Sequence, residues 1–130
     1  NGNTLASVFA EVHDYIVVNG FYFQNFTRQA NAAVHQELFD GIYKNRDIKL
    51  KIDKMQFLRP DLAITTVIGA GFPTGGKVPV DPSVIMTIIA EKKDNEWKII
   101  YFHNHSLHEA FQSEGNHPPY RVMYASWYKN

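Results

Sequence analysis

Cysteine is absent from this chain of 130 residues. Its absence excludes disulfide bonds, thiolate nucleophiles and thiolate metal sites, and it fits a cytoplasmic protein. No apolar run approaches the roughly 18 residues that a membrane-spanning helix needs, and no signal-peptide pattern opens the chain. An excess of either charge is also lacking, because 13 Lys and Arg residues balance 13 Asp and Glu residues. Neither nucleic acid nor an anionic membrane is therefore expected as a partner.

The composition is that of an ordinary globular protein. Hydrophobic residues make up 45% of the chain and charged residues 20%, and this length suffices to bury one core. We find no internal repeat, low-complexity tract or interdomain linker. The sequence therefore predicts a single domain over residues 1–130, with 107–130 as a C-terminal extension.

The first part of the chain predicts a helix, a hairpin and a second helix. Thr4 is a plausible N-cap for a short helix over residues 4–12, in which apolar residues recur at helical spacing. Residues 15–18 and 21–24 flank Asn19-Gly20, a dipeptide that favours a type I′ hairpin turn. Thr27 is expected to cap a helix that extends to about Tyr43. Its expected apolar stripe consists of Ala30, Ala33, Val34, Leu38, Phe39 and Ile42.

The rest of the chain predicts four long strands. Residues 48–57 alternate with a phase shift near Asp53-Lys54, which indicates a β-bulge. Strands are expected at 62–68, 84–90 and 97–105, with Arg59 and Asp61 as a turn pair and Asp94-Asn95 as the last turn. The segment 69–83 reads as a long loop or lid because it is rich in Gly and Pro. Residues 107–111 predict a helical turn broken by the later Pro118-Pro119, and 120–128 predict an extra strand or a segment that packs on a partner subunit.

Histidines provide the candidate chemistry. His35 falls within the apolar stripe of the second helix, where it is either a hydrogen-bonded core residue or a pocket residue. On the last strand, side-chain alternation predicts that one face carries Trp97, Ile99, Tyr101, His103 and His105 and that the opposite face carries Ile100, Phe102 and Asn104. Only one of His103 and Asn104 should therefore enter a pocket, unless the end of the strand twists.

Several strings, in their order and spacing, resemble a known superfamily. They are LASVFA (5–10), VNG (18–20), HQELFDG (35–41), FLRPDLA (57–63) and the strand that ends in HNHS (97–106). Together with the order of predicted elements, they resemble the NTF2-like superfamily and, within it, the SnoaL-like, SgcJ/EcaC-type proteins. The resemblance implies an α+β cone, in which a curved, mostly antiparallel sheet wraps around helices. It also implies a small-molecule cavity inside the cone and a homodimer that forms through the sheet.

Relatives in this superfamily include isomerases, dehydratases, epoxide hydrolases and polyketide cyclases, so the resemblance does not fix a reaction. The ketosteroid isomerase general base would fall at Val18 or Asn19, and strand 84–90 lacks a carboxylate for the oxyanion acid. That particular mechanism is not expected. Such folds usually begin with a long helix over the cavity, and this chain starts at what resembles the second helix. We expect the lid to be missing or supplied otherwise.

The sequence therefore predicts binding of a small apolar or polycyclic molecule, with general acid/base catalysis as the candidate activity. The candidate catalytic residues are His35 and His103. The candidate ligand-binding residues are Tyr15, Phe39, Phe57, Met86, Tyr101, Asn104 and His105. No cofactor is expected, and no metal, because the H-x-H pair lacks an evident third ligand, for which His13, His35 and Asp40 were the available choices. The alternative is a noncatalytic ligand-binding or dimerisation module whose cone is filled by its own side chains.

Overall fold

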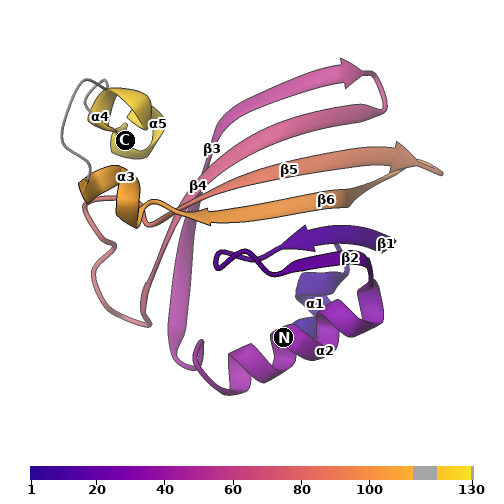
Figure 1. Ribbon diagram of the computed structural model, residues 1–130, viewed down its shortest axis with the longest axis horizontal. Coiled ribbons are helices and arrows are strands. Elements are labelled where there is room, and N and C mark those ends of the chain that lie inside the picture. Colours follow the sequence, from indigo (N-terminus) through magenta and orange to yellow (C-terminus); the bar gives the residue numbers. More distant parts are fainter. Residues whose placement is uncertain (113–119, 130) are drawn as a thin grey trace.

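The computed structural model describes residues 1–112 and 120–129 and shows one curved sheet with short helices around it (Figure 1). The elements are α1 (Gly2–Ala6), β1 (Phe9–Ile16), β2 (Tyr22–Thr27), α2 (Arg28–Asp40), β3 (Arg46–Arg59), β4 (Leu62–Pro73), β5 (Val84–Lys93), β6 (Glu96–Ser106), α3 (His108–Gln112), α4 (Tyr120–Met123) and α5 (Ala125–Tyr128). The strand order in the six-stranded sheet is β2-β1-β6-β5-β4-β3. Only the β1–β6 pair is parallel, so the predicted curved, mostly antiparallel α+β fold is confirmed.

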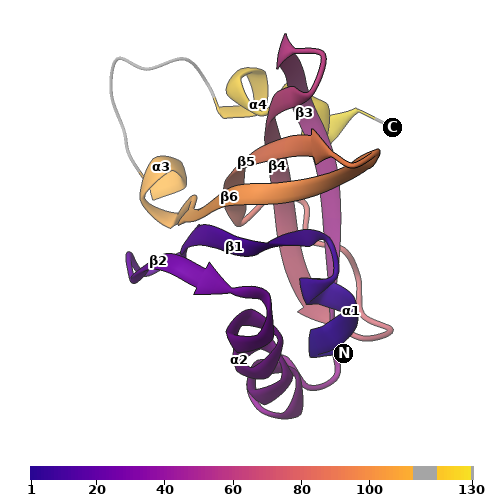
Figure 2. The same ribbon diagram turned by 90° about the vertical axis from the view of Figure 1, so that its right-hand side faces the viewer.

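The helices lie at two separate places on the sheet. α1 and α2 lie together beside β1 and β2 in both views, whereas α4 and α5 lie near β3 at the other end of the molecule (Figures 1 and 2). No described helix is long and apolar enough to cross a membrane.

One face of the sheet carries the main core. Residues paired across neighbouring strands share a face, and the pairs Asn104–Met86, Met86–Val67 and Val67–Ile52 trace this face from β6 to β3. The buried cluster on it consists of Phe9, Tyr15, Val67, Met86 and Phe102. The rings of Tyr15 and Phe102 stack with centroids 4.6 Å apart, and burial of each such side chain contributes roughly 1.5–3 kcal/mol. We call this face the inner face.

The β3 end of the inner face is apolar and exposed. Its side chains, which we call the β3 row, are each at least half exposed to solvent: Ile48, Leu50, Ile52, Met55 and Phe57. The ring of Phe57 meets that of Trp97 edge-on, with centroids 5.9 Å apart. The predicted bulge is confirmed, since the β3–β4 register shifts between Ile52 and Lys54 and so keeps Met55 and Phe57 on the inner face.

The first predicted helix is too long at its C-terminal end. Asn1 rather than Thr4 is the N-cap of α1, which ends at Ala6, and β1 begins at Phe9. The spacing of Val8, Phe9 and Val12 fits a helix locally. The segment is nevertheless extended, because parallel pairing with β6, for example Phe9 with Ile99, supplies backbone partners from far along the chain.

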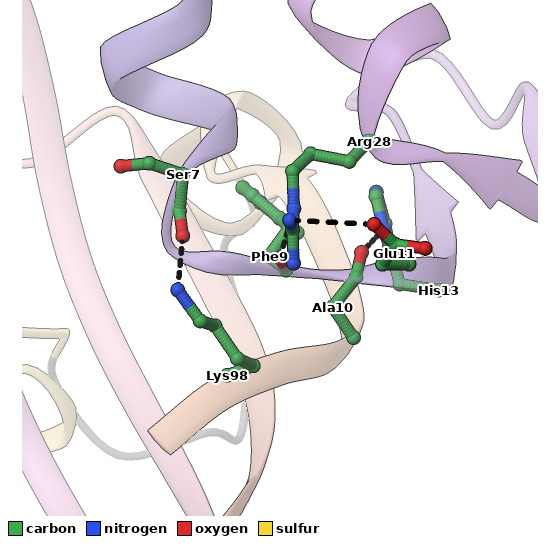
Figure 3. A network of polar contacts seen from close by, with 7 residues as sticks. All are labelled: Ser7, Phe9, Ala10, Glu11, His13, Arg28 and Lys98. Atoms are coloured by element: carbon green, nitrogen blue, oxygen red, sulfur yellow. Dashed lines mark hydrogen bonds and ion pairs between the residues drawn. The ribbon is translucent and has the colours of Figure 1, made fainter. Parts of the chain in front are cut away.

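Polar contacts fix the start of β1 between α2 and β6 (Figure 3). The Arg28 guanidinium donates from Nε to the carbonyl oxygen of Phe9 over 2.9 Å, and it also lies 3.7 Å from a carboxylate oxygen of Glu11. From the other side, Lys98 Nζ donates to the carbonyl oxygen of Ser7 over 2.6 Å. These contacts satisfy backbone carbonyls at a point where the chain changes from helix to strand.

The hairpin between β1 and β2 lies where the sequence predicts it, but its turn is of another type. Gly20 has a φ of 90°, whereas Asn19 is not in the left-handed region. The amide of Gly20 donates to the carbonyl of Val17, and the amide of Val17 to that of Phe21. This pattern indicates a three-residue loop closed by a left-handed glycine. Asp94 and Asn95, in contrast, both have positive φ, which suits the tight turn before β6.

The predicted cap of α2 is confirmed, since Thr27 accepts a hydrogen bond from the amide of Ala30. The helix ends at Asp40, three residues earlier than predicted, with Gly41 as its C-cap. The predicted apolar stripe is wrong in its centre: the buried side chains of the helix are Asn31 and His35, whereas Ile42 is 71% exposed. The helix therefore presents a polar line to the inside of the molecule.

The expected loop 69–83 is shorter than predicted, because β4 continues to Pro73. Gly69 belongs to this strand for a steric reason. A Cβ atom at Gly69 would lie 2.7 Å from the Leu50 side chain and 3.3 Å from that of Val84, so the missing side chain lets the neighbouring strands close over it. Arg59 and Asp61 form the predicted turn pair, at 3.4 Å.

The C-terminal extension forms helices that pack on this chain's own sheet, so the predicted extra strand over 120–128 is wrong. The helical turn expected at 107–111 corresponds to α3, and Pro118-Pro119 lies outside the described residues. Trp127 of α5 packs with Ile68 and Ala70 on the face opposite the inner face, which we call the outer face. There Lys51 Nζ donates to backbone carbonyls of Ser126, Trp127 and Lys129, which the end of the helix leaves unpaired.

Candidate functional site

A cavity of about 520 Å³ lies where the end of α2 and the start of β3 meet the inner face. It is lined by Leu5, Tyr15, His35, Phe39, Tyr43, Arg46, Asp47, Ile48, Gly71, Ser83, Val84 and Asn104. A smaller hollow of about 70 Å³ shares Tyr15, His35, Tyr43 and Asn104 with it. The larger volume falls within the range of roughly 300–1,000 Å³ that small-molecule sites occupy.

A hydrogen-bonded pair, Tyr15 and His35, lies at the part of the cavity that both hollows share. His35 Nδ1 lies 3.0 Å from the carbonyl oxygen of Asn31, one turn earlier on α2. A carbonyl oxygen only accepts, so Nδ1 carries the proton and Nε2 carries a lone pair. The Tyr15 hydroxyl therefore donates to His35 Nε2, across 3.1 Å. The fold thus fixes the tautomer of a neutral imidazole.

Asn31 links this pair to a second buried histidine. Its side-chain amide donates to His13 Nε2 over 2.9 Å, and His13 Nδ1 donates to the carbonyl oxygen of Ala10, also over 2.9 Å (Figure 3). The Asn31 side chain is fully buried, and His13 is 3% exposed. One asparagine of α2 therefore orients two imidazoles, one through its side chain and the other through its backbone carbonyl.

Burial sets the proton states of these groups. It lowers the pKa of His35, against the opposing effect of the hydrogen bond to the Asn31 carbonyl. Burial also lowers the pKa of His13, against the opposing hydrogen bond to the Ala10 carbonyl. The same cause raises the pKa of Tyr15. Near pH 7 the site therefore holds a neutral imidazole, which accepts protons, beside a phenol that keeps its proton.

Asn104 lines the cavity and carries an unsatisfied acceptor. Its Oδ1 atom is buried and has no hydrogen-bond partner among the residues that the structure describes. A buried acceptor without a partner costs roughly 1–3 kcal/mol. A hydroxyl or amine hydrogen of a bound molecule would remove this cost.

The structure brings together part of the predicted site. Tyr15, His35, Phe39 and Asn104 line the cavity. Met86 lies on the same face but is buried in the core cluster, and Phe57 lies in the exposed β3 row. Neither is among the residues that line the cavity.

Tyr101, His103 and His105 lie on the outer face, away from the cavity. The physical reason is strand alternation: Asn104 points to the inner face, so its two neighbours in the sequence point to the other. The rings of His103 and His105 lie edge-on, with centroids 6.3 Å apart. In the described part of the chain, no group of three or more His, Cys, Asp or Glu side chains is arranged to hold a metal ion.

Sequence reasoning missed four cavity residues that carry polar groups: Tyr43, Arg46, Asp47 and Ser83. Tyr43 lies in the turn between α2 and β3, Arg46 begins β3, and Ser83 precedes β5. Only the position of Arg46 at the start of an alternating strand, on the face of Ile48, could have indicated that it faces inward. Asn31 was missed too, because a helical asparagine usually faces solvent.

No protein-family model matches the chain, and no curated protein matches it. Among solved structures, it is similar to a domain of unknown function with a cystatin-like fold from Nostoc punctiforme, with 25% identity, 85% of this chain and 69% of that chain covered, and a TM-score of 0.71. An NTF-2 like protein of unknown function from Shewanella oneidensis has 17% identity, coverage of 80% and 82%, and a TM-score of 0.62. A ketosteroid isomerase-like protein from Erwinia carotovora has 10% identity, coverage of 82% of each chain, and a TM-score of 0.62. The fold is therefore the NTF2-like fold that the sequence resemblance implied.

Proposed function

We propose that this protein binds a small, largely apolar molecule in the cavity and that His35 acts on it as a general base through Tyr15. The observation that carries the proposal is a cavity of about 520 Å³ on which a neutral His–Tyr pair and an unpaired Asn104 oxygen converge. A cone filled by its own side chains, as the noncatalytic alternative requires, would leave no such space. We also propose that the protein is SnoaL-like and that it is located in the cytoplasm.

The proton path in this proposal follows the hydrogen bonds. A ligand with an acidic C–H or O–H group gives its proton to the Tyr15 oxygen while the phenolic proton moves to His35 Nε2. The imidazolium that forms keeps its Nδ1 hydrogen bond to the Asn31 carbonyl, which stabilises the positive charge. Asn104 accepts a hydrogen bond from the ligand and so orients it. No cofactor is needed for this step.

The test uses 5-nitrobenzisoxazole, a neutral aromatic carbon acid whose ring opens when a base removes its proton. General-base catalysis contributes roughly 10²–10⁴-fold, so we expect the wild-type protein to open the probe faster than buffer does. His35→Gln should lower kcat/KM at least about tenfold, because glutamine keeps an acceptor for Tyr15 but cannot take the proton.

His103→Gln is the matched control, because His103 lies on the outer face. It also tests the sequence prediction that His103 is catalytic. An undiminished rate in His35→Gln would remove His35 from the mechanism, and a loss confined to His103→Gln would move the chemistry to the outer face. Circular dichroism would verify that both variants are folded.

The sequence also predicted a homodimer through the sheet, and we propose that the β3 row forms its interface. The observation in favour is the row of five apolar side chains, each 50–60% exposed, because contiguous exposed apolar patches on soluble proteins mark interaction sites. Ile48 belongs both to this row and to the cavity lining. A second copy on the row would therefore adjoin the ligand site.

Sedimentation velocity tests this interface. We expect the wild-type protein to sediment as a dimer and Phe57→Lys to sediment as a monomer, because the lysine would bury a charge in the apolar contact. Val122→Lys is the control, since Val122 is 68% exposed but lies on α4, away from the row. A monomeric wild-type protein, or a dimeric Phe57→Lys variant, would contradict the proposed interface.

A further inference from the structure

Among the described residues that line the cavity, one cationic side chain forms no ion pair. Arg46, the first residue of β3, lines the larger hollow, which the Tyr15–His35 pair also lines, but it does not line the smaller hollow. The ion pairs within the described ranges join Arg28 to Glu11 and Arg59 to Asp61, and neither includes Arg46. Its guanidinium has no carboxylate within 4 Å among these residues.

The surroundings of Arg46 leave space for a ligand group. A Cβ atom at Gly71, on the neighbouring strand, would lie 3.6 Å from Arg46 Nη2, in ordinary van der Waals contact, so the glycine leaves this position beside the guanidinium unfilled. Gly71 has no positive φ that would require glycine. The backbone conformation would therefore allow a side chain at Gly71, and the glycine matters here because it leaves space beside Arg46.

The one acidic residue of the lining, Asp47, does not neutralise this cation. It follows Arg46 directly on the strand, and alternation directs its side chain to the opposite face. There the Thr74 hydroxyl donates to its carboxylate over 3.4 Å. The other lining residues, apart from His35, carry no ionisable acid or base except the phenols of Tyr15 and Tyr43.

We propose that the ligand is an amphipathic monocarboxylate whose carboxylate pairs with Arg46. The inference rests on the proposed function and adds the chemical class of the ligand. A guanidinium matches a carboxylate with two parallel hydrogen bonds. One cation without a second basic side chain favours a monoanion over a phosphate dianion. Leu5, Phe39 and Val84 hold the apolar body, and a hydrogen-bond donor at the far end meets Asn104.

The experiment compares two probes that differ in charge alone, 6-hydroxy-2-naphthoate and its primary amide. Calorimetric titration should show that the wild-type protein binds the carboxylate at least about tenfold more tightly than the amide, with the difference shrinking as salt is raised. Arg46→Gln should abolish this preference by weakening carboxylate binding while leaving amide binding unchanged. Arg46→Lys should retain part of it, because the charge remains without the planar fork.

Arg59→Gln is the control, since Arg59 is an exposed arginine at the β3–β4 turn, and it should keep the full preference. Equal affinity for the two probes in the wild-type protein, or an undiminished preference in Arg46→Gln, would overturn the anion inference and leave ligand binding intact. Failure of both probes to bind would contradict the proposed function itself and this inference with it.

Discussion

Replacement of Trp127 by Ala is expected to lower the free energy of unfolding by about 3–5 kcal/mol, the range typical of a large aromatic residue removed from a core. Trp127 is 5% exposed and packs on Ile68 and Ala70 of β4. Its indole nitrogen donates to the carbonyl oxygen of Val80 over 2.9 Å, so the substitution also leaves that acceptor without its partner. Urea denaturation followed by circular dichroism measures the change.

Trp97→Ala is the matched control, because Trp97 is 41% exposed in the inner-face apolar surface. It should cost clearly less than Trp127→Ala, since less apolar area leaves the protein interior. If Trp127→Ala changed the free energy of unfolding by less than about 1 kcal/mol, the C-terminal helices would be dispensable for the sheet. That result would contradict the packing of α5 as a structural layer.

Acidification from pH 7.5 to 5 is expected to destabilise the protein steeply. Burial lowers the pKa values of His13 and His35 in the folded state, whereas in the unfolded chain both titrate near 6.5. Below about pH 6.5 the unfolded state therefore binds more protons than the folded state, and stability falls as pH falls. Each histidine contributes at most about 1.4 kcal/mol per pH unit, and this contribution ends once pH drops below its folded pKa.

Thermal or urea unfolding at a series of pH values measures this slope. His13→Gln and His35→Gln should each flatten it, because each removes one buried imidazole that must gain a proton on unfolding. His105→Gln should leave the slope unchanged, since His105 is exposed on the outer face. An equal slope in the wild-type protein and in the double variant of His13 and His35 would show that other groups govern acid unfolding.

Local signals in the sequence were enough for much of the fold. The Thr27 cap, the Asp53-Lys54 bulge and the Asp94-Asn95 turn each depend on residues close together in the chain, and each is confirmed. The alternation of β6 is confirmed only from Tyr101 to His105. Trp97 and Ile99, expected on the face of Tyr101, lie on the inner face, because the β5–β6 register shifts between Ile89 and Ala90. The resemblance to the NTF2-like superfamily then predicted that the sheet is curved. Predictions failed where contacts with distant parts of the chain determine the local structure. One example is β1, which is extended because it pairs with β6 about 90 residues later.

In the candidate site, too, local patterns predicted some features and missed those that depend on distant contacts. Alternation alone separated Asn104 from His103, and the helical projection turned His35 inward. Neither pattern reveals that Tyr15 donates to His35, or that Asn31 orients two histidines, because these contacts join elements that meet only in the folded chain.

The sequence by itself therefore determined the order of the elements from the β1–β2 hairpin to β6, the faces of most strand residues and the inward position of His35, because periodicity and capping are local properties of the backbone. Only the tertiary structure decided which inward residues meet. The parallel β1–β6 pair and the packing of α2 beside it bring Tyr15, His35 and Asn104 to one cavity, and the bend from α2 into β3 adds Arg46 at its edge. Such a meeting depends on contacts between distant segments, and no local pattern of residues encodes it.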